Sequence, residues 1–384
     1  MRSIIMIYLD NSATTKPSSA VLESFQQVAE KFFANPSSLH QLGGESEKLL
    51  LKAKEQAAQL LHVAKDEIIF TSGGTEGNNL AIKGIALEHQ NRGKHIITSE
   101  IEHPSVYDAC RSLESLGFDI TYLPVDENGV ISIKDLEQSI RNDTILISVM
   151  HVNNELGSIQ PIEEIGRVAK KHPKLFLHVD DVQGLGKVPL NLNNSGIDLC
   201  TFSGHKIHGL KGTGILYIKN RTTLFPLFHG GNQEYALRSG TENLAGAVSM
   251  VKALRLIKER EKTEIEDLYD LQQYLRKHLT EIPGVEMNTP IQAAPHIVNI
   301  SIPGLKPEVM IHMLGEQKVF ISTKSACSSK HMDESKILTA CGFSKKNAIS
   351  ALRISLSYDT TKEEITRFLQ VFNKAIQQLK EVME

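Results

Sequence analysis

The sequence predicts an α/β protein with a mostly parallel sheet, followed by a smaller α+β domain. Three observations support this prediction. Short apolar runs alternate with helical stretches over most of the chain, which is the pattern of β-α units. Several of the runs are apolar throughout, as expected for strands covered on both faces. Near Asn243 the alternation gives way to longer helices.

The apolar runs and the segments between them define the elements of the larger domain. Strands are expected at Ile4–Leu9, Glu67–Thr71, His95–Ser99, Asp119–Leu123, Thr144–His151, Leu175–Val179, Leu199–Phe202 and Gly214–Ile218. Helices are expected at Ala20–Phe33, Ser46–Leu61, Asn78–Gln90, Ser105–Leu116, Ile133–Gln138 and Ile162–Lys171.

The second part of the chain begins with two expected helices, Leu244–Lys262 and Glu264–Thr280, and the second has its leucines on one side. Ile282-Pro283-Gly284 then ends that helix. Further elements are expected at Ile297–Ile302, Pro307–Leu314, Val319–Ser322, Leu352–Leu356 and Lys362–Val382. These elements predict a smaller α+β domain whose boundary lies near residue 260.

Composition and charge exclude several classes of protein. The chain has 384 residues, of which 41% are hydrophobic and 23% charged, so global disorder is excluded. The net charge of −3 disfavours a broad surface for nucleic acid or lipid head groups. No apolar run approaches the roughly 20 residues that span a bilayer, and Ile4–Leu9 is too short for a signal-peptide core. We expect a soluble, cytoplasmic protein.

The four cysteines, Cys110, Cys200, Cys327 and Cys341, include no CxxC pair and are too few for a disulfide scaffold. Reduced thiols are therefore expected. Cys110 and Cys200 are expected to pack in the core, and Cys341 is expected at a helix end. Cys327 differs because it lies in a polar segment between Lys324 and Lys330, whose charges favour a thiolate.

Polar residues follow three of the expected strands, at the edge where open α/β sheets bind ligands. The strand at Leu175–Val179 ends in Asp180, which points inward or caps a helix. Lys206 lies between glycine-rich turns, where it forms an imine with a carbonyl compound or is a solvated loop residue. The nearby pair His205 and His208 lacks further ligands for a metal, so zinc is disfavoured.

The third segment, Thr71–Asn79, contains small residues that open a helix, so backbone N–H groups approach a phosphate there. The segment lacks the patterns of a nucleotide P-loop and of a dinucleotide site, and a plain helix start is the alternative. An imine-forming lysine, an acid for a pyridinium nitrogen and a phosphate cradle are together what pyridoxal 5'-phosphate requires. The sequence therefore predicts this cofactor.

The chain resembles pyridoxal-phosphate cysteine desulfurases of the NifS/IscS type. The motifs that carry the resemblance are Tyr8–Thr15, Met150–Glu155, His178-Val179-Asp180 with Gln183, Ser203-Gly204-His205-Lys206, Arg238–Asn243 and Ser325-Ala326-Cys327. The resemblance implies the fold-type I architecture and a homodimer with active sites at the subunit interface. It also implies a large cofactor domain at 15–260 and a small domain at 1–14 plus 261–384 that carries the cysteine loop.

The resemblance also implies roles for individual residues. Lys206 would hold the cofactor covalently and move protons, Asp180 would pair with its ring nitrogen, and His103 would stack on the ring and take part in acid–base steps. Asn154 and Gln183 would bond near the phenolic oxygen, and Arg353, with Asn154, would bind the substrate carboxylate. The phosphate would be held by Gly74, Thr75, Ser203 and His205, and by Thr241 of the partner subunit.

Cys327 would be the catalytic thiolate that takes sulfur from L-cysteine as a persulfide, leaving L-alanine. The alternatives are a selenocysteine lyase or a cysteine-sulfinate desulfinase of the same fold, an aminotransferase, which Cys327 disfavours, and a non-catalytic protein, which the intact site disfavours. The sulfur would pass to a protein acceptor, either a tRNA-thiolating enzyme or an iron–sulfur scaffold.

Three departures from the resembled family are visible. Asp181 stands beside Asp180 where relatives often have alanine, so repulsion between the two acids is expected. Lys324 replaces a usual glycine in the cysteine segment. The chain ends at Glu384, soon after the last expected helix, without the tail with which iron–sulfur-assembly members bind their scaffold. This last departure weakens the case for a general iron–sulfur role, so a dedicated acceptor, such as a tRNA-thiolating enzyme, is at least an equal candidate.

Overall fold

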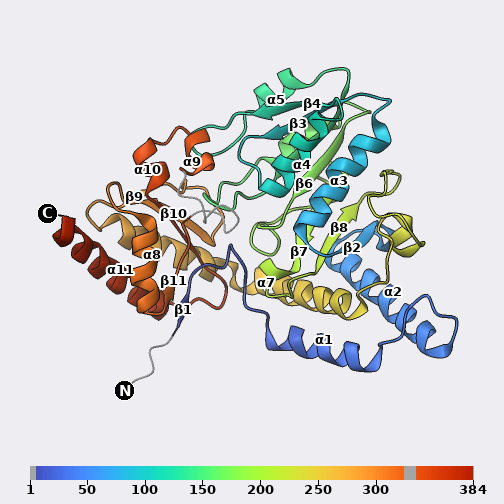
Figure 1. Ribbon diagram of the computed structural model, residues 1–384, viewed down its shortest axis with the longest axis horizontal. Helices are drawn as coiled ribbons and strands as arrows, with labels where there is room; N and C mark the ends of the chain where they lie inside the picture. The colour runs from blue at the N-terminus through green and yellow to red at the C-terminus, as the bar shows by residue number, and fades with distance from the viewer. Residues whose placement is uncertain (1–5, 324–333, 384) are drawn as a thin grey trace.

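The central feature of the fold is a twisted sheet, formed by segments that the sequence analysis assigns to strands. The computed structural model describes residues 6–323 and 334–383 (Figure 1). Within these residues the largest sheet has seven strands in the order β2 (Ile68–Thr71), β8 (Gly214–Ile218), β7 (Leu199–Ser203), β6 (Phe176–Asp180), β5 (Thr144–Met150), β3 (His95–Ser99) and β4 (Asp119–Leu123).

The pairing pattern confirms the predicted, mostly parallel sheet. Neighbouring strands from β7 to β4 are parallel, and β8 alone runs against both of its neighbours. Because β2 is antiparallel to β8, it runs in the same direction as β7. The carboxyl ends of β2, β3, β5, β6 and β7 therefore meet at one edge of the sheet, where ligands bind in such folds.

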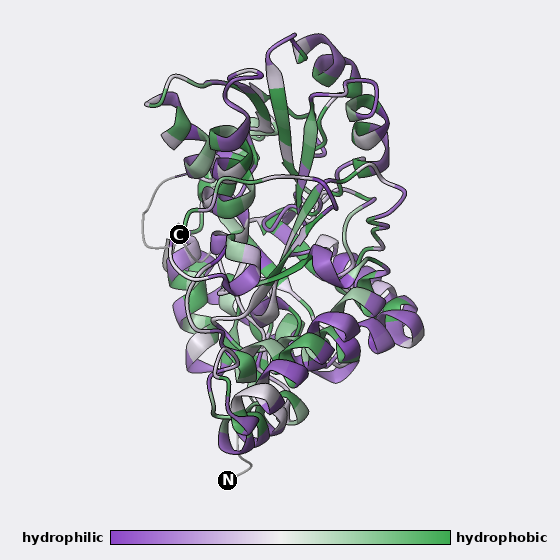
Figure 2. Cartoon of the chain, turned by 90° about the vertical axis from the view of Figure 1, so that its right-hand side faces the viewer, coloured by the Kyte–Doolittle hydropathy of each residue, from purple (hydrophilic) through white to green (hydrophobic). Residues whose placement is uncertain are grey.

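Helices cover both faces of this sheet, and a separate apolar core lies on each. Helices α3 (Gly74–His89) and α4 (Pro104–Glu114) pack on one face, with Ile69 and Leu216 of the sheet. The other face is covered by α2 (Gln41–Leu61), α6 (Ile162–Ala169) and the first half of α7 (Leu244–Thr280). Figure 2 shows the strands of this sheet in green between helices that carry much purple. Burial on both faces explains why the strand runs are apolar throughout.

Two peripheral helices complete the larger part of the molecule. Helix α1 (Ser19–Lys31) packs along α7, and α5 (Ile133–Ser139) contacts α6. The 3-10 turns η1 (Lys65–Glu67), η2 (Gly204–Lys206) and η3 (Gln233–Ala236) lie in the connections. Lys206, the predicted cofactor lysine, is thus the last residue of a tight turn that directly follows β7.

A further apolar core joins the N-terminal segment to the C-terminal third of the chain. Ile7 and Leu9 pack there with the second half of α7 and with Phe368 and Phe372. Its elements are β1 (Ile7–Tyr8), β9 (Glu286–Met287), β10 (Ile297–Ser301), α8 (Pro307–Glu316), β11 (Val319–Phe320), β12 (Ala351–Ser355) and α11 (Lys362–Met383). We propose the boundaries 15–260 and 1–14 plus 261–384 on the basis of these separate cores.

The predicted break between two helices after Lys262 is wrong, because α7 runs without interruption from Leu244 to Thr280. One ion pair bridges the expected break, between Arg260 and Glu264, whose Nη2 and Oε2 atoms are 2.8 Å apart. Such i,i+4 pairs favour a continuous helix. The short helices α9 (Lys336–Ala340) and α10 (Lys345–Ile349) were missed because five residues give no periodicity.

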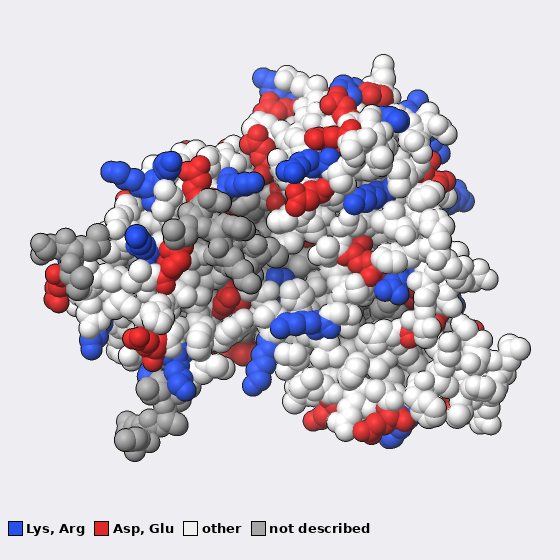
Figure 3. All heavy atoms as spheres, in the orientation of Figure 1, with Lys and Arg blue, Asp and Glu red and all other residues white. Residues whose placement is uncertain are grey.

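Charged side chains of both signs are interspersed over the face shown in Figure 3, as the nearly neutral composition predicts. Within residues 6–323 and 334–383, none of the helices has the length and apolar character needed to cross a membrane.

We predict that Gln272→Met destabilises the smaller core. Gln272 is buried on α7, and its amide donates to the carbonyls of Ala294, at 2.7 Å, and Ile297, at 3.0 Å. Methionine keeps the volume but leaves both carbonyls without this donor, which costs about 1–3 kcal/mol. Urea denaturation measures the change. The exposed neighbour Gln273 is the control, and Gln273→Met should leave the midpoint unchanged.

Candidate active site

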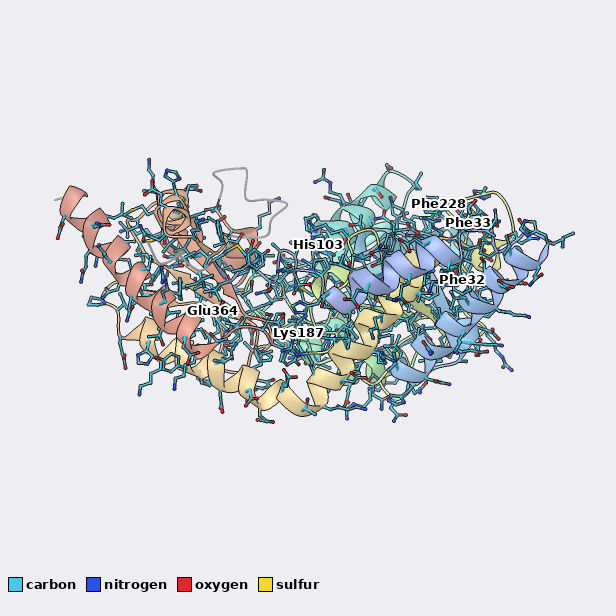
Figure 4. All side chains as sticks on the ribbon, turned by 90° about the horizontal axis from the view of Figure 1, so that it is seen from below. Phe32, Phe33, His103, Lys187, Phe228 and Glu364 are labelled. Atoms are coloured by element: carbon cyan, nitrogen blue, oxygen red, sulfur yellow. The ribbon has the colours of Figure 1, made fainter. Side chains whose placement is uncertain are left out.

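One pocket, with a volume of about 190 Å³, lies at the sheet edge where the carboxyl ends of the strands meet. Ten of the predicted site residues line it: Gly74, Thr75, His103, Asn154, Asp180, Gln183, Ser203, His205, Lys206 and Arg353. Thr241 is exposed and is not among the residues that line this pocket. Cys327 and Lys324 lie outside the described residues. In Figure 4 His103 lies in the middle of the molecule.

The predicted phosphate cradle is the N-terminus of α3. Gly73 caps this helix with φ of 147°, a backbone conformation that favours glycine. A Cβ on Gly74 would lie 2.9 Å from Val182 Cγ2, so the helix start fits closely against the loop after β6. The first backbone N–H groups of α3 have no partners within the helix and are available to an anion. Ser203 and His205 line the same pocket from the end of β7 and from η2.

Lys206 reaches across the pocket to the N-terminal segment. Its Nζ donates to the carbonyl of Ala13 at 2.9 Å and also to that of Ser12. The backbone is tied to the same segment, because Thr15 N donates to the His205 carbonyl at 2.8 Å. The motif Tyr8–Thr15 thus forms one wall of the pocket around the predicted cofactor lysine.

Asp180 lies buried at the end of β6, as the alternation of that strand predicts. Its Oδ2 accepts from Asn78 Nδ2 at 2.7 Å, and its Oδ1 accepts from the backbone N–H of Val182 at 3.0 Å. Two donors therefore fix the orientation of the carboxylate. The alternative considered from sequence, a simple helix cap, is wrong because no helix begins at Asp180.

His103 caps α4, and two groups of Ser105 contact its ring. Its Nδ1 accepts from Ser105 N at 3.2 Å and lies 2.8 Å from Ser105 Oγ. Burial lowers the pKa of His103; the Lys206 charge lowers it further, whereas Asp180 and Asp108 oppose this change. The ring is therefore neutral at physiological pH.

Gln183 joins the N-terminal segment to a buried histidine. Its Nε2 donates to the Ser12 carbonyl at 3.0 Å, and its Oε1 lies 3.3 Å from His296 Nε2. Burial holds the pKa of His296 well below its usual value. His296 is therefore neutral, and its Nε2 donates to Gln183 Oε1. This contact and the one with Ser12 fix the amide of Gln183 in the wall of the pocket.

Arg353 is 1% exposed and connects three segments that are distant in the sequence. Its Nη1 donates to the Asn154 carbonyl at 2.8 Å, and its Nη2 lies 2.9 Å from Asp10 Oδ1. Its Nε has no hydrogen-bond partner among the described residues. Burial raises the pKa of Asp10, and Arg353 and Lys206 oppose that effect. A planar guanidinium with an unused donor suits the recognition of a carboxylate.

Asp181 does not compete with Asp180 for the pocket. Its Oδ1 lies 2.6 Å from Nδ1 of buried His151, so its side chain has a partner of its own. Burial raises the pKa of Asp181, with a smaller contribution from Asp180, while His151 and Lys187 lower it. The expected repulsion is thus present but secondary to burial and to the His151 partner.

The three cysteines that the structure describes are buried free thiols, as predicted. Burial raises the pKa of Cys110 to about 12, that of Cys200 well above its usual value and that of Cys341 to about 12. Cys341 ends α9, as expected. A thiol with such a pKa is not a thiolate at neutral pH, so none of these three is suited to be a nucleophile.

The pocket fits pyridoxal 5'-phosphate. It combines a helix N-terminus for a phosphate, an oriented carboxylate for a ring nitrogen and a lysine amine. Three polar atoms of residues lining it are buried without a hydrogen-bond partner among the described residues, namely Ser12 Oγ, Asn78 Oδ1 and Arg353 Nε. A polar ligand bound in the pocket would supply partners for such atoms.

Sequence reasoning missed three residues of the site. Asn78 lies on α3 and bonds Asp180, Ser105 bonds His103, and Asp10 bonds Arg353. Asn78 and Asp10 were part of recognised segments, but nothing local to them shows their partners. The only local signal for Ser105 is its position two residues after a histidine that caps a helix.

The aminotransferase class-V family model matches residues 7–368. A NifS/IcsS protein homolog of Lactobacillus delbrueckii subsp. bulgaricus is 45% identical over 380 residues, which cover 98% of this chain and 99% of that protein. Cysteine desulfurase IscS of Dictyoglomus turgidum is 43% identical, with coverage of 98% and 96%. A solved NifS-like protein superimposes with a TM-score of 0.92 at 35% identity, covering 97% of this chain and 100% of that one.

The chain therefore belongs to the class-V aminotransferase family, the pyridoxal-phosphate enzymes of fold type I. Within that family it is a member of the NifS/IscS-type cysteine desulfurases. The predicted fold class, family and cofactor are confirmed.

We predict that Glu102→Gln removes a pH dependence of stability. Glu102 precedes His103 and is fully buried; its Oε1 accepts from Ser99 Oγ at 2.6 Å and from Met150 N at 3.0 Å. Burial raises its pKa from 4.5 to about 8. Between pH 4.5 and about 8, Glu102 keeps its proton in the folded chain but has lost it in the unfolded chain. The free energy of unfolding therefore falls as pH rises through this window, by at most about 1.4 kcal/mol per unit.

Urea denaturation at pH 5, 6, 7 and 8 measures this effect. The unfolding free energy of Glu102→Gln should fall less with pH than that of the wild type. Exposed Glu100 supplies the control, since Glu100→Gln should retain the wild-type slope. An equal slope in all three proteins would show that Glu102 is ionised in the folded state.

Proposed function

We propose that this enzyme releases sulfur from L-cysteine, forms L-alanine and holds the sulfur as a persulfide on Cys327. The observation that carries the proposal is that Lys206, Asp180 and Arg353 line one pocket. The first two suit a pyridoxal cofactor, and the third suits the carboxylate of an amino acid. The selenocysteine lyase and sulfinate desulfinase alternatives do not need a cysteine that receives the sulfur.

The residues of the pocket would share the work as follows. Gly74, Thr75, Ser203 and His205 would hold the cofactor phosphate, Lys206 would bind the cofactor, and Asp180 would hold its ring nitrogen in the protonated form. Bound there, the cofactor ring supplies a sink for the electrons of the substrate's α-carbon. Lys206 Nζ would remove and return the proton at that carbon, since its amine is attached at the reacting end.

Arg353 would orient the substrate at the other end of the pocket. Because Nη1 and Nη2 are occupied by the Asn154 carbonyl and Asp10, the guanidinium cannot turn freely. Its unpartnered Nε would then donate to one carboxylate oxygen. A fixed donor of this kind selects α-amino acids by their carboxylate and leaves the side chain to face the rest of the pocket.

The attachment of the segment that contains Cys327 supports the role of this thiol. Before the segment, Ser322 exchanges two backbone hydrogen bonds with Arg353, of 3.1 and 2.7 Å. After it, Ser335 Oγ donates to Glu155 Oε2 at 2.7 Å, next to Asn154 in the chain. Cys327 is five residues from Ser322, and five residues span at most about 17 Å. The described residues on either side of the segment are thus tied to Arg353 and to the neighbour of Asn154, which supports the proposed role of Cys327.

The sulfur transfer requires no external oxidant, because the bonds formed and broken account for all electrons. The Cys327 thiolate forms a bond to the substrate sulfur while the bond between that sulfur and the β-carbon breaks. The electron pair of the broken bond stays with the carbon skeleton, which takes up a proton and leaves as alanine. Sulfur thereby remains on the protein as a persulfide, ready for a nucleophile on an acceptor.

We predict that Cys327→Ala retains the cofactor but forms no alanine from cysteine. The substitution removes only the thiol, and the residues that line the cofactor pocket are unchanged. Cofactor absorbance and alanine release measure the two properties. Cys341→Ala is the matched control and should keep wild-type turnover, because Cys341 is buried and its pKa is raised to about 12. Alanine formation by Cys327→Ala would refute the assignment.

We further propose that the enzyme is a homodimer in which Thr241 completes the partner's phosphate site. Helix α1, the segment after it and the first turn of α2 expose a group of large apolar side chains, Leu22, Phe25, Phe33, Leu39 and Leu42. Such a surface marks an interface. A neighbouring groove is lined by Phe25 and by Asn243, two residues after Thr241. Phe33 and Phe228, another exposed side chain, lie at the same end of the molecule in Figure 4.

We predict that two inactive variants, Lys206→Ala and Thr241→Glu, regain activity when they are unfolded together and refolded as mixed dimers. In a mixed dimer one site receives both defects and the other receives none, so about a quarter of all sites recover. Alanine formation measures the recovery. Each variant refolded alone is the control. Thr241 would act within its own chain if mixing restored nothing while mixed dimers formed.

The sulfur acceptor is proposed to be a protein, either a tRNA-thiolating enzyme or an iron–sulfur scaffold, in the cytoplasm. The free thiols of Cys110, Cys200 and Cys341 support a reducing compartment. Enzyme loaded with ³⁵S-cysteine and offered purified candidates of each kind identifies the acceptor, since only the true one removes the label from Cys327 at catalytic rates.

A further inference from the structure

A continuous set of hydrogen bonds joins the acid of the cofactor site to its histidine. Asn78 Nδ2 donates to Asp180 Oδ2 at 2.7 Å and to Ser105 Oγ at 2.8 Å. Ser105 Oγ in turn lies 2.8 Å from His103 Nδ1. The set connects β6, α3 and the start of α4. Neither Asn78 nor Ser105 has been given a role in the reaction above.

The donors and acceptors in this set have only one consistent arrangement. The Asp180 carboxylate accepts, so the Asn78 amide must face it with nitrogen, and its second hydrogen goes to Ser105 Oγ. The backbone N–H of Ser105 points at His103 Nδ1 from 3.2 Å, so that ring nitrogen is an acceptor. The Ser105 hydroxyl then donates to the same nitrogen. Every hydrogen is used, and Nδ1 carries none.

We propose that Ser105 is a positioning residue that holds His103 in the neutral tautomer with its proton on Nε2. His103 then offers the pocket a hydrogen-bond donor, directed at an electron-rich atom of the substrate. The proposal rests on the proposed function for the place of His103 beside the substrate. It goes further because it specifies which ring nitrogen carries the proton and which residue decides this.

The surroundings of the ring support a neutral imidazole. An imidazolium would bring an N–H on Nδ1 against the N–H of Ser105 and would force the Ser105 hydroxyl to turn away. The charged groups that act on the ring are Lys206 on η2, which disfavours the cation, and Asp180 on β6 and Asp108 on α4, which favour it. Asp180 is already engaged by Asn78, which weakens its pull.

The arrangement has a consequence for the order of proton transfers. With Nε2 protonated and Nδ1 accepting from two donors, His103 has no free lone pair in the pocket. It therefore enters the reaction as a donor and becomes a base only after its Nε2 proton has been handed on. Lys206 is left as the group that removes the first proton.

The test uses the holoenzyme with ¹⁵N-labelled histidine, and the variant His103→Gln identifies the ring signals. We expect Nδ1 of His103 to show the chemical shift of an unprotonated nitrogen and Nε2 that of a protonated one. In Ser105→Ala the Nδ1 shift should move, and the ring pKa should rise by about half a unit, as the loss of one hydrogen bond to the neutral ring predicts. The acidic limb of the kcat profile should move with it.

Two further variants separate this effect from a general disturbance of α4. Ser105→Thr keeps the hydroxyl and should restore the wild-type Nδ1 shift. Ser112→Ala removes a hydroxyl from the same helix that bonds only the carbonyl of Ala109, at 2.8 Å, and should change nothing. A protonated Nδ1 in the wild type, or an unchanged shift in Ser105→Ala, would overturn the proposal. Since the spectra come from resting enzyme, they stand apart from whether Cys327 receives sulfur.

Discussion

The buried guanidinium of Arg353 is the interaction on which the geometry of the site depends most. It comes from β12 in the C-terminal core, yet its donors engage Asn154 after β5 and Asp10 in the N-terminal segment. A buried cation requires such partners, because an unpaired charge in this position would be costly. The same contacts hold Arg353, proposed to bind the substrate, in the wall of the pocket that Lys206 and Asp180 also line. The proposed recognition of the substrate and a buried contact between the C-terminal core and the sheet therefore involve the same side chain.

The direction of the strands explains how the remaining groups meet. Because β2, β3, β5, β6 and β7 all end at the same edge, the phosphate cradle, His103, Asn154, Asp180 and Lys206 each follow a different strand yet line one pocket. The N-terminal segment then closes over this edge, where Lys206 and Gln183 both bond the Ser12 carbonyl. Residues of the opening motif thus act as a wall of the site as well as a link to Arg353.

The sequence could predict what is decided locally. Lys206 was predicted because it lies between glycine-rich turns just after an apolar strand, Asp180 because it ends one, and the cradle because small residues open a helix. The resemblance supplied His103 and Arg353. The partners were missed, since Asn78 and Asp180 are 102 residues apart and Asp10 and Arg353 are 343 apart. The break expected after Lys262 was wrong, since α7 continues through it and the ion pair between Arg260 and Glu264 joins the turns on either side.

Asp181 shows how a second acid is tolerated beside Asp180. Its carboxylate is turned to His151, and the turn that follows leaves no room for a side chain, because a Cβ on Gly184 would lie 2.1 Å from Asp181 Oδ1 and 2.5 Å from His151 Nδ1. Behind them Lys187, whose pKa burial lowers to about 8, donates to the Lys206 carbonyl at 3.0 Å. The negative charge of Asp181 raises the pKa of Lys187, and the positive charge of Lys187 lowers the pKa of Asp181. Each residue thus opposes the effect of burial on the other. The extra acid thus stabilises a buried cation whose ammonium holds the backbone of Lys206, the residue proposed to bind the cofactor.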